Sequence, residues 1–280
     1  MRLPPRANSP NKLCGGDLVQ FPSASVFDRA GRAACAAGCV QRKEFHESFA
    51  GAQLVVDHFF NETDAAARPS HVVDVAAGHG MLGWLVLALV AALAPRAPGA
   101  LPTVFAVDRR MPPSAAALRD AFVCEWPELG ARHRYIVADA EQLAPRQGAL
   151  LVAMHACGGL SDVVLQKAVD CGASVAVAPC CHSLRTARLP RARLDTAFRR
   201  AGEDGDLASA LDAERSGHLR DAGFRVTERR LDRAITPMNR VLLGHAPPRP
   251  EPPRQRNGAP FAGNAFQQRL PEPPAVWRSS

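Results

Sequence analysis

The sequence contains only three lysines, Lys12, Lys43 and Lys167, although lysine and arginine together number 34. It also lacks a basic run with interleaved aromatic residues, the pattern that proteins binding single-stranded nucleic acid use. Abundant arginine and alanine with so little lysine is typical of GC-rich coding bias. The net charge of +7 therefore permits an acidic partner such as RNA without indicating one.

Long hydrophobic runs and a secretory cysteine pattern are missing as well. No run reaches the roughly 18 uncharged apolar residues that a membrane-spanning helix needs. The eight cysteines follow no secreted disulfide framework, and no signal peptide precedes them. We therefore predict an intracellular, cytoplasmic protein without membrane association, and nothing indicates an obligate oligomer. The alternative is organellar import, because residues 1–40 contain no acidic residue before Asp17.

Composition divides the chain into three regions. Residues 1–40 are rich in proline, glycine and alanine and lack a hydrophobic period, which predicts a flexible N-terminal arm. Residues 41–246 hold the predicted domain. Within it, the polar, arginine-rich stretch 183–206 is interpreted as a substrate lid, or alternatively as a solvated insertion. Residues 247–280 contain nine of the 24 prolines and no hydrophobic period, which predicts a disordered tail.

Hydrophobic periodicity within the domain alternates between strand and helix. Strands are predicted at 72–76, 104–107, 135–137, 150–154 and 174–178. Helices are predicted at 42–61, 84–93, 114–123, 162–169 and 208–222. Two further strands, 224–230 and 240–243, close the sheet as a hairpin-like pair. This order predicts an α/β fold, a doubly wound, Rossmann-like sheet of seven strands of the class I methyltransferase type.

The run His71-Val-Val-Asp-Val-Ala-Ala-Gly-His-Gly-Met-Leu-Gly83 has the spacing of a nucleotide-binding turn between a strand and a helix. Gly78 and Gly80 let the backbone approach a ligand, and the following helix presents free N–H groups beside it. Asp74 ends the strand, where we expect it to face the cleft. A carboxylate there suits the sulfonium and amino group of S-adenosylmethionine better than the pyrophosphate of a dinucleotide.

Carboxylates also follow the next two predicted strands. Because ligands of a doubly wound sheet bind beyond the carboxyl ends of its strands, Asp108 and Asp139 are candidate cofactor contacts. Asp108 is placed to take the ribose hydroxyls, and Asp139 suits the adenine amino group. Together with Asp74, Gly78 and Gly80, they predict S-adenosylmethionine as the cofactor.

Two other functions remain open on these residues. An NAD(P)-dependent oxidoreductase satisfies the same glycine spacing, and Arg109-Arg110 can take a 2′-phosphate. Against this stand the closing strand pair and the lack of a second, substrate-binding domain. A non-catalytic protein that binds the cofactor is the third reading, because binding survives loss of an acceptor site.

Histidine and cysteine residues follow the fourth and fifth predicted strands, as His155-Ala-Cys157 and Cys180-Cys181-His182. These strands are neighbours in this fold, so their ends converge where a methyl acceptor enters. Four roles stay open: a histidine base or orienting group, a covalent cysteine, a zinc site, and a structural role. His155 is our choice for the polar group on the acceptor side. No metal is predicted, because adjacent cysteines are poor co-ligands and the spacing matches no common zinc motif.

Five segments carry a resemblance to a known family: Val-Asp-Val-Ala-Ala-Gly-His-Gly-Met-Leu-Gly at 73–83, Ala-Val-Asp-Arg-Arg-Met-Pro-Pro-Ser at 106–114, Met-His-Ala-Cys-Gly-Gly-Leu-Ser-Asp at 154–162, Ala-Pro-Cys-Cys-His at 178–182 and Ile-Thr-Pro-Met-Asn-Arg-Val-Leu-Leu-Gly at 235–244. With them the chain resembles class I S-adenosylmethionine-dependent methyltransferase-domain proteins marked by a Cys-Cys-His segment. That group is similar to the tRNA 2′-O-methyltransferase 13 type and to the methyltransferase part of glutathione S-transferase C-terminal domain-containing protein.

The resemblance covers about residues 43–244 and implies a set of functional residues. It implies cofactor contacts at Asp74, Gly78, Gly80 and Asp108, and an acceptor side lined by His155, Asp162 and Cys180 to His182. It also makes RNA the leading class of methyl acceptor. The zinc-finger regions that accompany the tRNA enzymes do not occur in this sequence, which weakens the case for tRNA recognition by that route.

Overall fold

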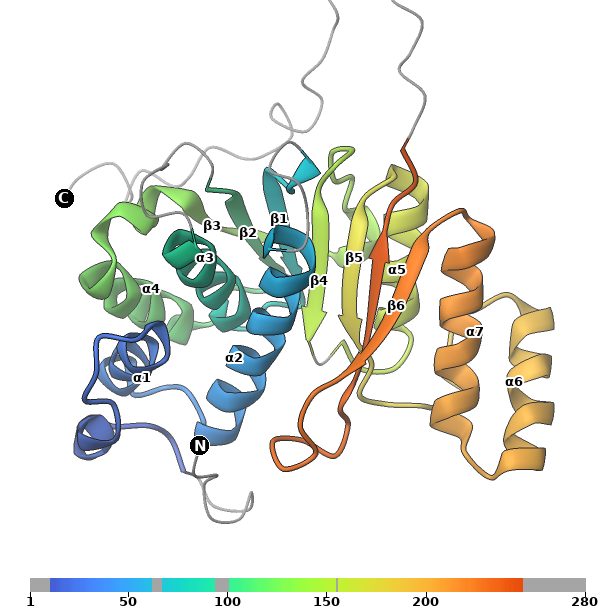
Figure 1. Ribbon diagram of the computed structural model, residues 1–280, viewed down its shortest axis with the longest axis horizontal. Coiled ribbons are helices and arrows are strands. Elements are labelled where there is room, and N and C mark those ends of the chain that lie inside the picture. The colour runs from blue at the N-terminus through green and yellow to red at the C-terminus, as the bar shows by residue number, and fades with distance from the viewer. Residues whose placement is uncertain (1–10, 62–66, 94–100, 155, 249–280) are drawn as a thin grey trace, which may run out of the picture.

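The computed structural model describes residues 11–61, 67–93, 101–154 and 156–248. Its centre is a seven-stranded sheet in the order β3-β2-β1-β4-β5-β7-β6 (Figure 1). The strands are β1 (His71–Val75), β2 (Thr103–Asp108), β3 (His133–Val137), β4 (Leu150–Met154), β5 (Ser174–Ala178), β6 (Arg225–Arg230) and β7 (Arg240–His245). Strands β1 to β5 are parallel, whereas β7 runs antiparallel to β5 and β6. The predicted seven-stranded doubly wound fold is confirmed, including the closing strand pair.

The winding of the sheet reverses beside β1, which pairs with β2 on one side and β4 on the other. At such a reversal the connections leave in opposite directions, and a crevice opens beyond the carboxyl ends of the strands. Strands β4 and β5 also pair directly, with Met154 opposite Ala178 at their ends. The loops that follow β1, β2, β4 and β5 therefore meet at one edge of the sheet.

One face of the sheet is covered by α2 (Arg42–Val56), α3 (Met81–Leu93) and α4 (Pro113–Glu125), and α1 (Val26–Ala37) packs outside them (Figure 1). Helix α3 is apolar around its whole circumference because the sheet, α1 and α2 enclose it. Its Trp84 and Leu85 are fully buried. This enclosure holds the first turn of α3 rigidly beside the glycine turn.

The other face is covered by α5 (Leu160–Cys171) and α7 (Leu207–Asp221). Helix α6 (Arg191–Asp204) packs on α7 at the edge of the molecule (Figure 1). Four short helical segments complete the described elements: η1 (Gly15–Gln20), η2 (Asp57–Asn61), η5 (Pro127–Arg132) and η6 (Ala140–Gln142). Only a short η6 lies between β3 and β4, which leaves that side of the crevice open to the loops around it.

The predicted flexible arm is wrong for residues 11–40, which are folded against the domain. Ser25 caps α1 by accepting the backbone N–H of Asp28 at 3.1 Å, and Gly38 ends the helix with φ +61°. The alanine-rich composition reflects close packing, because Ala33 and Ala34 are almost fully buried. Small side chains let α1 approach α4, so low hydrophobic bulk here marks a tight helix interface and not an absence of structure.

Two further predictions concern segments outside the described residues. The candidate transit peptide begins with residues 1–10, and most of the predicted tail is residues 249–280; the structure describes neither segment. None of the helices in the described part of the chain is long and apolar enough to cross a membrane.

Candidate functional site

The turn between β1 and α3 is held by side chains from three neighbouring strands. Asp74 on β1 accepts the backbone N–H of Gly83 at 3.0 Å. Asp108 on β2 accepts the N–H of Gly78 at 3.0 Å, and the hydroxyl of Tyr135 on β3 donates to the Gly78 carbonyl at 2.6 Å. The turn is therefore fixed in place by polar contacts from β1, β2 and β3.

Positive φ values let this turn fold tightly. Gly78 and Gly80 have φ of +56° and +85°, and Ala76 adopts +58° although it is not a glycine. Glycine at position 83 serves a different purpose, because a Cβ there would lie 2.8 Å from Val104 Cγ1. Because Gly83 has no Cβ, α3 can approach β2 closely, as expected for the third glycine of a nucleotide-binding turn.

Asp74 does not face the cleft as predicted. Its side chain is buried beneath the turn, with only 2% of the residue exposed. Burial raises the pKa of Asp74 to about 7, an effect that the Gly83 N–H partly offsets. The sequence could not predict this orientation because both faces of β1 are covered. Its apolar residues therefore lie on both faces, and no alternation of polar and apolar residues shows which side chain reaches the ligand. Asp74 shapes the turn from within.

A cavity of about 610 Å³ opens beyond the carboxyl ends of β1, β2 and β4. Two of the predicted carboxylates, Asp108 and Asp139, lie in its wall. The cavity is lined by Val75, Ala76, Val107, Asp108, Arg109, Asp139, Ala140, Glu141, Cys157, Gly158, Gly159, Leu160, Val163, Arg185, Thr186, Ala187 and Arg188. Six of these 17 residues are charged and seven are valine, alanine or leucine, and they come from the ends of β1 to β5 and the segments that follow them.

Two acid–arginine pairs stand in the cavity wall. Asp139 pairs with Arg109 at 3.0 Å and also accepts the backbone N–H of Glu141 at 2.9 Å, which caps η6. Glu141 in turn pairs with Arg188. These pairs neutralise much of the charge in the wall. Among the described residues, Asp108 has no arginine partner, and its Oδ2 accepts the Gly78 N–H.

The stretch 183–206 divides into two parts. Residues 185–188 line the cavity, whereas residues 191–204 form α6 and pack on α7, away from the cavity. Sequence reasoning located the arginine-rich segment but not α6, in which Ala197 alone is buried. Only the first part of the predicted lid stands over the cavity.

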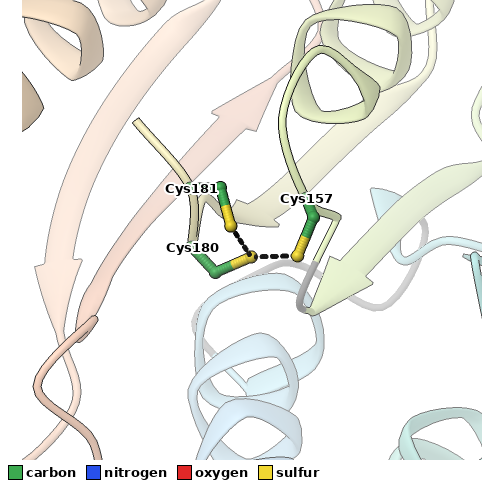
Figure 2. A group of neighbouring side chains, drawn as sticks. All are labelled: Cys157, Cys180 and Cys181. Carbon is green, nitrogen blue, oxygen red and sulfur yellow. Dashed lines mark hydrogen bonds between the residues drawn. The ribbon is translucent and has the colours of Figure 1, made fainter. Parts of the chain in front are cut away.

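Three cysteine side chains converge beside the cavity (Figure 2). Cys157 follows β4, and Cys180 and Cys181 follow β5. The sulfur atoms of Cys157 and Cys180 lie 2.8 Å apart, and those of Cys180 and Cys181 lie 3.7 Å apart. Burial raises the pKa of Cys180, and the thiols of Cys157 and Cys181 raise it further. His155, the histidine chosen for the acceptor side, lies outside the described residues.

His182, predicted on the acceptor side, is nearly buried and does not line the cavity. Its Nε2 lies 2.9 Å from Asp212 Oδ1, and its side chain is only 7% exposed. Asp162, placed on the acceptor side by resemblance, is buried as well and accepts Arg215 Nε at 2.7 Å. Arg215 also binds Asp212 at 3.0 Å. These four residues form a buried polar network that joins α5, α7 and the loop after β5, so they position the site without lining it.

Residues 46–187 match the family described as Methyltransferase domain, which is just over half of the 280 residues. The chain belongs to this methyltransferase-domain family. The matched segment runs from α2 to the loop over the cavity and contains both the glycine turn and the cysteine cluster. The predicted methyltransferase class is confirmed, and the oxidoreductase alternative is set aside.

Solved structures similar to this methyltransferase domain match it at low identity. An O-methyltransferase family protein from Burkholderia thailandensis is 18% identical, covers 83% of this chain and 67% of its own, and gives a TM-score of 0.41. Magnesium protoporphyrin IX methyltransferase from Synechocystis PCC 6803, with bound SAM, is 14% identical, covers 81% and 94%, and gives 0.45. No curated protein matches the chain. Likenesses of this degree carry no information on the substrate.

The structure of the methyltransferase domain also reveals a pair that sequence reasoning missed. His79, between the two glycines of the turn, places Nε2 2.9 Å from Glu44 Oε1 near the start of α2. Because the two residues are 35 positions apart, no local pattern joins them. Only the packing of α2 over the glycine turn brings this acid–imidazole pair to the site.

Proposed function

We propose that this domain transfers a methyl group from S-adenosylmethionine to an acceptor that binds beside the ends of β4 and β5. The observation that carries the proposal is Asp108, held by the Gly78 N–H at the wall of a cavity of about 610 Å³. An acidic side chain fixed at the end of β2 next to a glycine turn suits a ligand with vicinal hydroxyls, which donate hydrogen bonds to a carboxylate.

The residues present fit this cofactor in size and chemistry. Small-molecule sites occupy about 300–1,000 Å³, and this cavity lies within that range. Its apolar part, which includes Val107 and Leu160, suits a purine ring, and Asp108 suits a ribose. Asp139 already pairs with Arg109 and accepts the N–H of Glu141. An adenine amino group would therefore have to donate to a carboxylate oxygen that one of these groups also contacts.

The chain's own contribution to catalysis is orientation and exclusion of water. When bound, S-adenosylmethionine supplies an electrophilic methyl group on its sulfonium. Transfer by direct displacement needs the acceptor atom in line with that methyl group, and fixed geometry accounts for much of such rate enhancements. Thr186 and Arg188 cover one side of the cavity, while the Asp74–Gly83 hydrogen bond fixes the turn on the other.

The acceptor remains a matter of prediction. His155 stays our proposed polar group on the acceptor side, with Cys180 and Cys181 beside it. RNA stays the predicted acceptor class, on the resemblance described above. The Glu44–His79 pair lies next to the glycine turn and adds a candidate base for a hydroxyl or amine acceptor.

Calorimetric titration with S-adenosylmethionine tests the proposal, with NADPH as the competing ligand. We expect saturable binding of S-adenosylmethionine and none of NADPH. Asp108→Asn should weaken binding about 10- to 100-fold, because hydrogen bonds to a charged group contribute about 1.5–3 kcal/mol. Asp120→Asn on α4 is the matched control, since Asp120 is exposed and contacts only Arg119 among the described residues; it should leave the Kd unchanged.

Three outcomes would contradict the proposal. They are no binding of S-adenosylmethionine, preferential binding of NADPH, and an unchanged Kd in Asp108→Asn. The first two reject the cofactor, whereas the third rejects only the assignment of Asp108.

A further inference from the structure

We propose that Cys157, Cys180 and Cys181 form a binding site for a thiophilic divalent metal ion of the Zn²⁺ type. The site would lie at the ends of β4 and β5 and would join the two loops that follow these strands. It is independent of the cofactor and needs only the three thiols.

Strand pairing brings these residues together. β4 and β5 are parallel neighbours, with Met154 opposite Ala178 at their last paired positions. Cys157 lies three residues after the first of these, and Cys180 two residues after the second. In Figure 2 the three sulfur atoms point toward one another from the two loops. The sequence predicts that these strand ends converge but not where the three sulfur atoms lie. The expectation of no metal rested on the adjacency of Cys180 and Cys181 and on the spacing along the chain.

The sulfur positions match the dimensions of a metal site. A zinc–thiolate bond of about 2.3 Å places two sulfurs of a tetrahedral site roughly 3.8 Å apart. Cys180 and Cys181 already stand at 3.7 Å, and all three sulfurs lie within 4.8 Å of one another. The 2.8 Å between Cys157 and Cys180 must lengthen by about 1 Å on binding. Cys157 is exposed, so rotation about its χ1 can provide this movement.

The charge of the three thiolates favours a cation at this site. Three thiolates at these distances repel one another strongly unless a cation lies between them. Binding of one divalent ion would displace up to three protons to the buffer and remove that repulsion.

Three protein ligands leave one coordination position open. Cys157 lines the cavity, and both Cys157 and Cys181 are exposed. A site with three protein ligands usually completes its coordination with water. The structure thus assigns a metal that fixes the wall of the cavity and carries an exchangeable water.

Titration of the reduced protein with Cd²⁺ tests the site, because cadmium–thiolate bonds absorb in the near ultraviolet. We expect one ion per chain with a charge-transfer band, and displacement of that ion by Zn²⁺. Cys157→Ser and Cys181→Ser should each weaken the band and lower affinity at least tenfold. Cys124→Ser is the matched control, since Cys124 is exposed on α4, and it should bind as the natural protein does.

Three results would overturn the proposal. One is the absence of a charge-transfer band, and another is a band that Cys157→Ser leaves unchanged. The third is a Cys157–Cys180 disulfide, identified by mass spectrometry in protein kept under thiol reductant, since that bond would consume two of the ligands. None of these results depends on S-adenosylmethionine, so they are distinguishable from failure of the proposed function.

Discussion

Arg215 on α7 is fully buried and holds two buried carboxylates, so its replacement by methionine is a stringent test of how the site is assembled. Its Nε lies 2.7 Å from Asp162 on α5, and a second nitrogen lies 3.0 Å from Asp212 on α7. Methionine fills much of the same space with a flexible apolar chain. The substitution therefore removes the charge while limiting the cavity that is left.

The expected loss of stability follows from the two carboxylates that remain buried after the substitution. Removing one partner of a buried ion pair costs about 3–5 kcal/mol, because the remaining charge is uncompensated. In Arg215→Met, Asp162 keeps the backbone N–H of Arg188 at 2.6 Å, and Asp212 keeps His182 at 2.9 Å. These contacts satisfy part of each carboxylate but do not replace the guanidinium. We expect a loss of about 3–5 kcal/mol, a large share of the roughly 5–15 kcal/mol that stabilises a typical domain.

Urea unfolding at pH 7, followed by circular dichroism, measures this loss. Arg220→Met on the same helix is the control, because Arg220 is half exposed and lies 3.6 Å from Glu228. An exposed pair of this kind contributes at most about 1 kcal/mol. A loss below about 1 kcal/mol in Arg215→Met, or equal losses in both variants, would refute the reasoning that the buried network assembles the site.

Two further substitutions probe the glycine turn. Because burial raises the pKa of Asp74 from 3.8 to about 7, the folded protein retains a proton that the unfolded chain releases, so stability should fall as pH rises between these values. This loss of stability should amount to up to about 4 kcal/mol between pH 4 and pH 8, measured by urea unfolding, and Asp74→Asn should abolish it. The same dependence of stability on pH in Asp74→Asn would contradict this prediction. Ala76 has φ +58°, so Ala76→Gly should stabilise the protein by up to about 1 kcal/mol, and a lower urea midpoint would show that this conformation is unstrained.

Much of the sheet could be predicted from local pattern. Strands β4 and β5 occur at 150–154 and 174–178 as predicted, because apolar runs of this length between loop residues are too short for a buried helix. Helix α1 was missed although local signals were present, because alanine favours helices, Ser25 caps its start and Gly38 ends it. Helix α6 was harder to predict, because its sequence is mostly polar and its partner is α7.

Within the site, the sequence predicted position along the chain better than direction in space. Asp108 ends β2 and Asp139 lies just after β3, and both line the cavity. Asp74 follows the same rule yet lies beneath the turn, and His182 turns toward Asp212 while Cys180 beside it faces Cys157. Which way a side chain points after a strand depends on the loop backbone and on partners from α5 and α7, which no local spacing encodes.

The sequence by itself therefore determined the fold class and the glycine turn, because strand and helix periods and glycine spacing are local properties of the chain. Only the tertiary structure decided that Cys157 joins Cys180 and Cys181, that His79 meets Glu44, and that Arg215 holds two acids from different helices. These groups are separated along the chain and meet only when parallel strands and packed helices bring distant loops to one edge of the sheet.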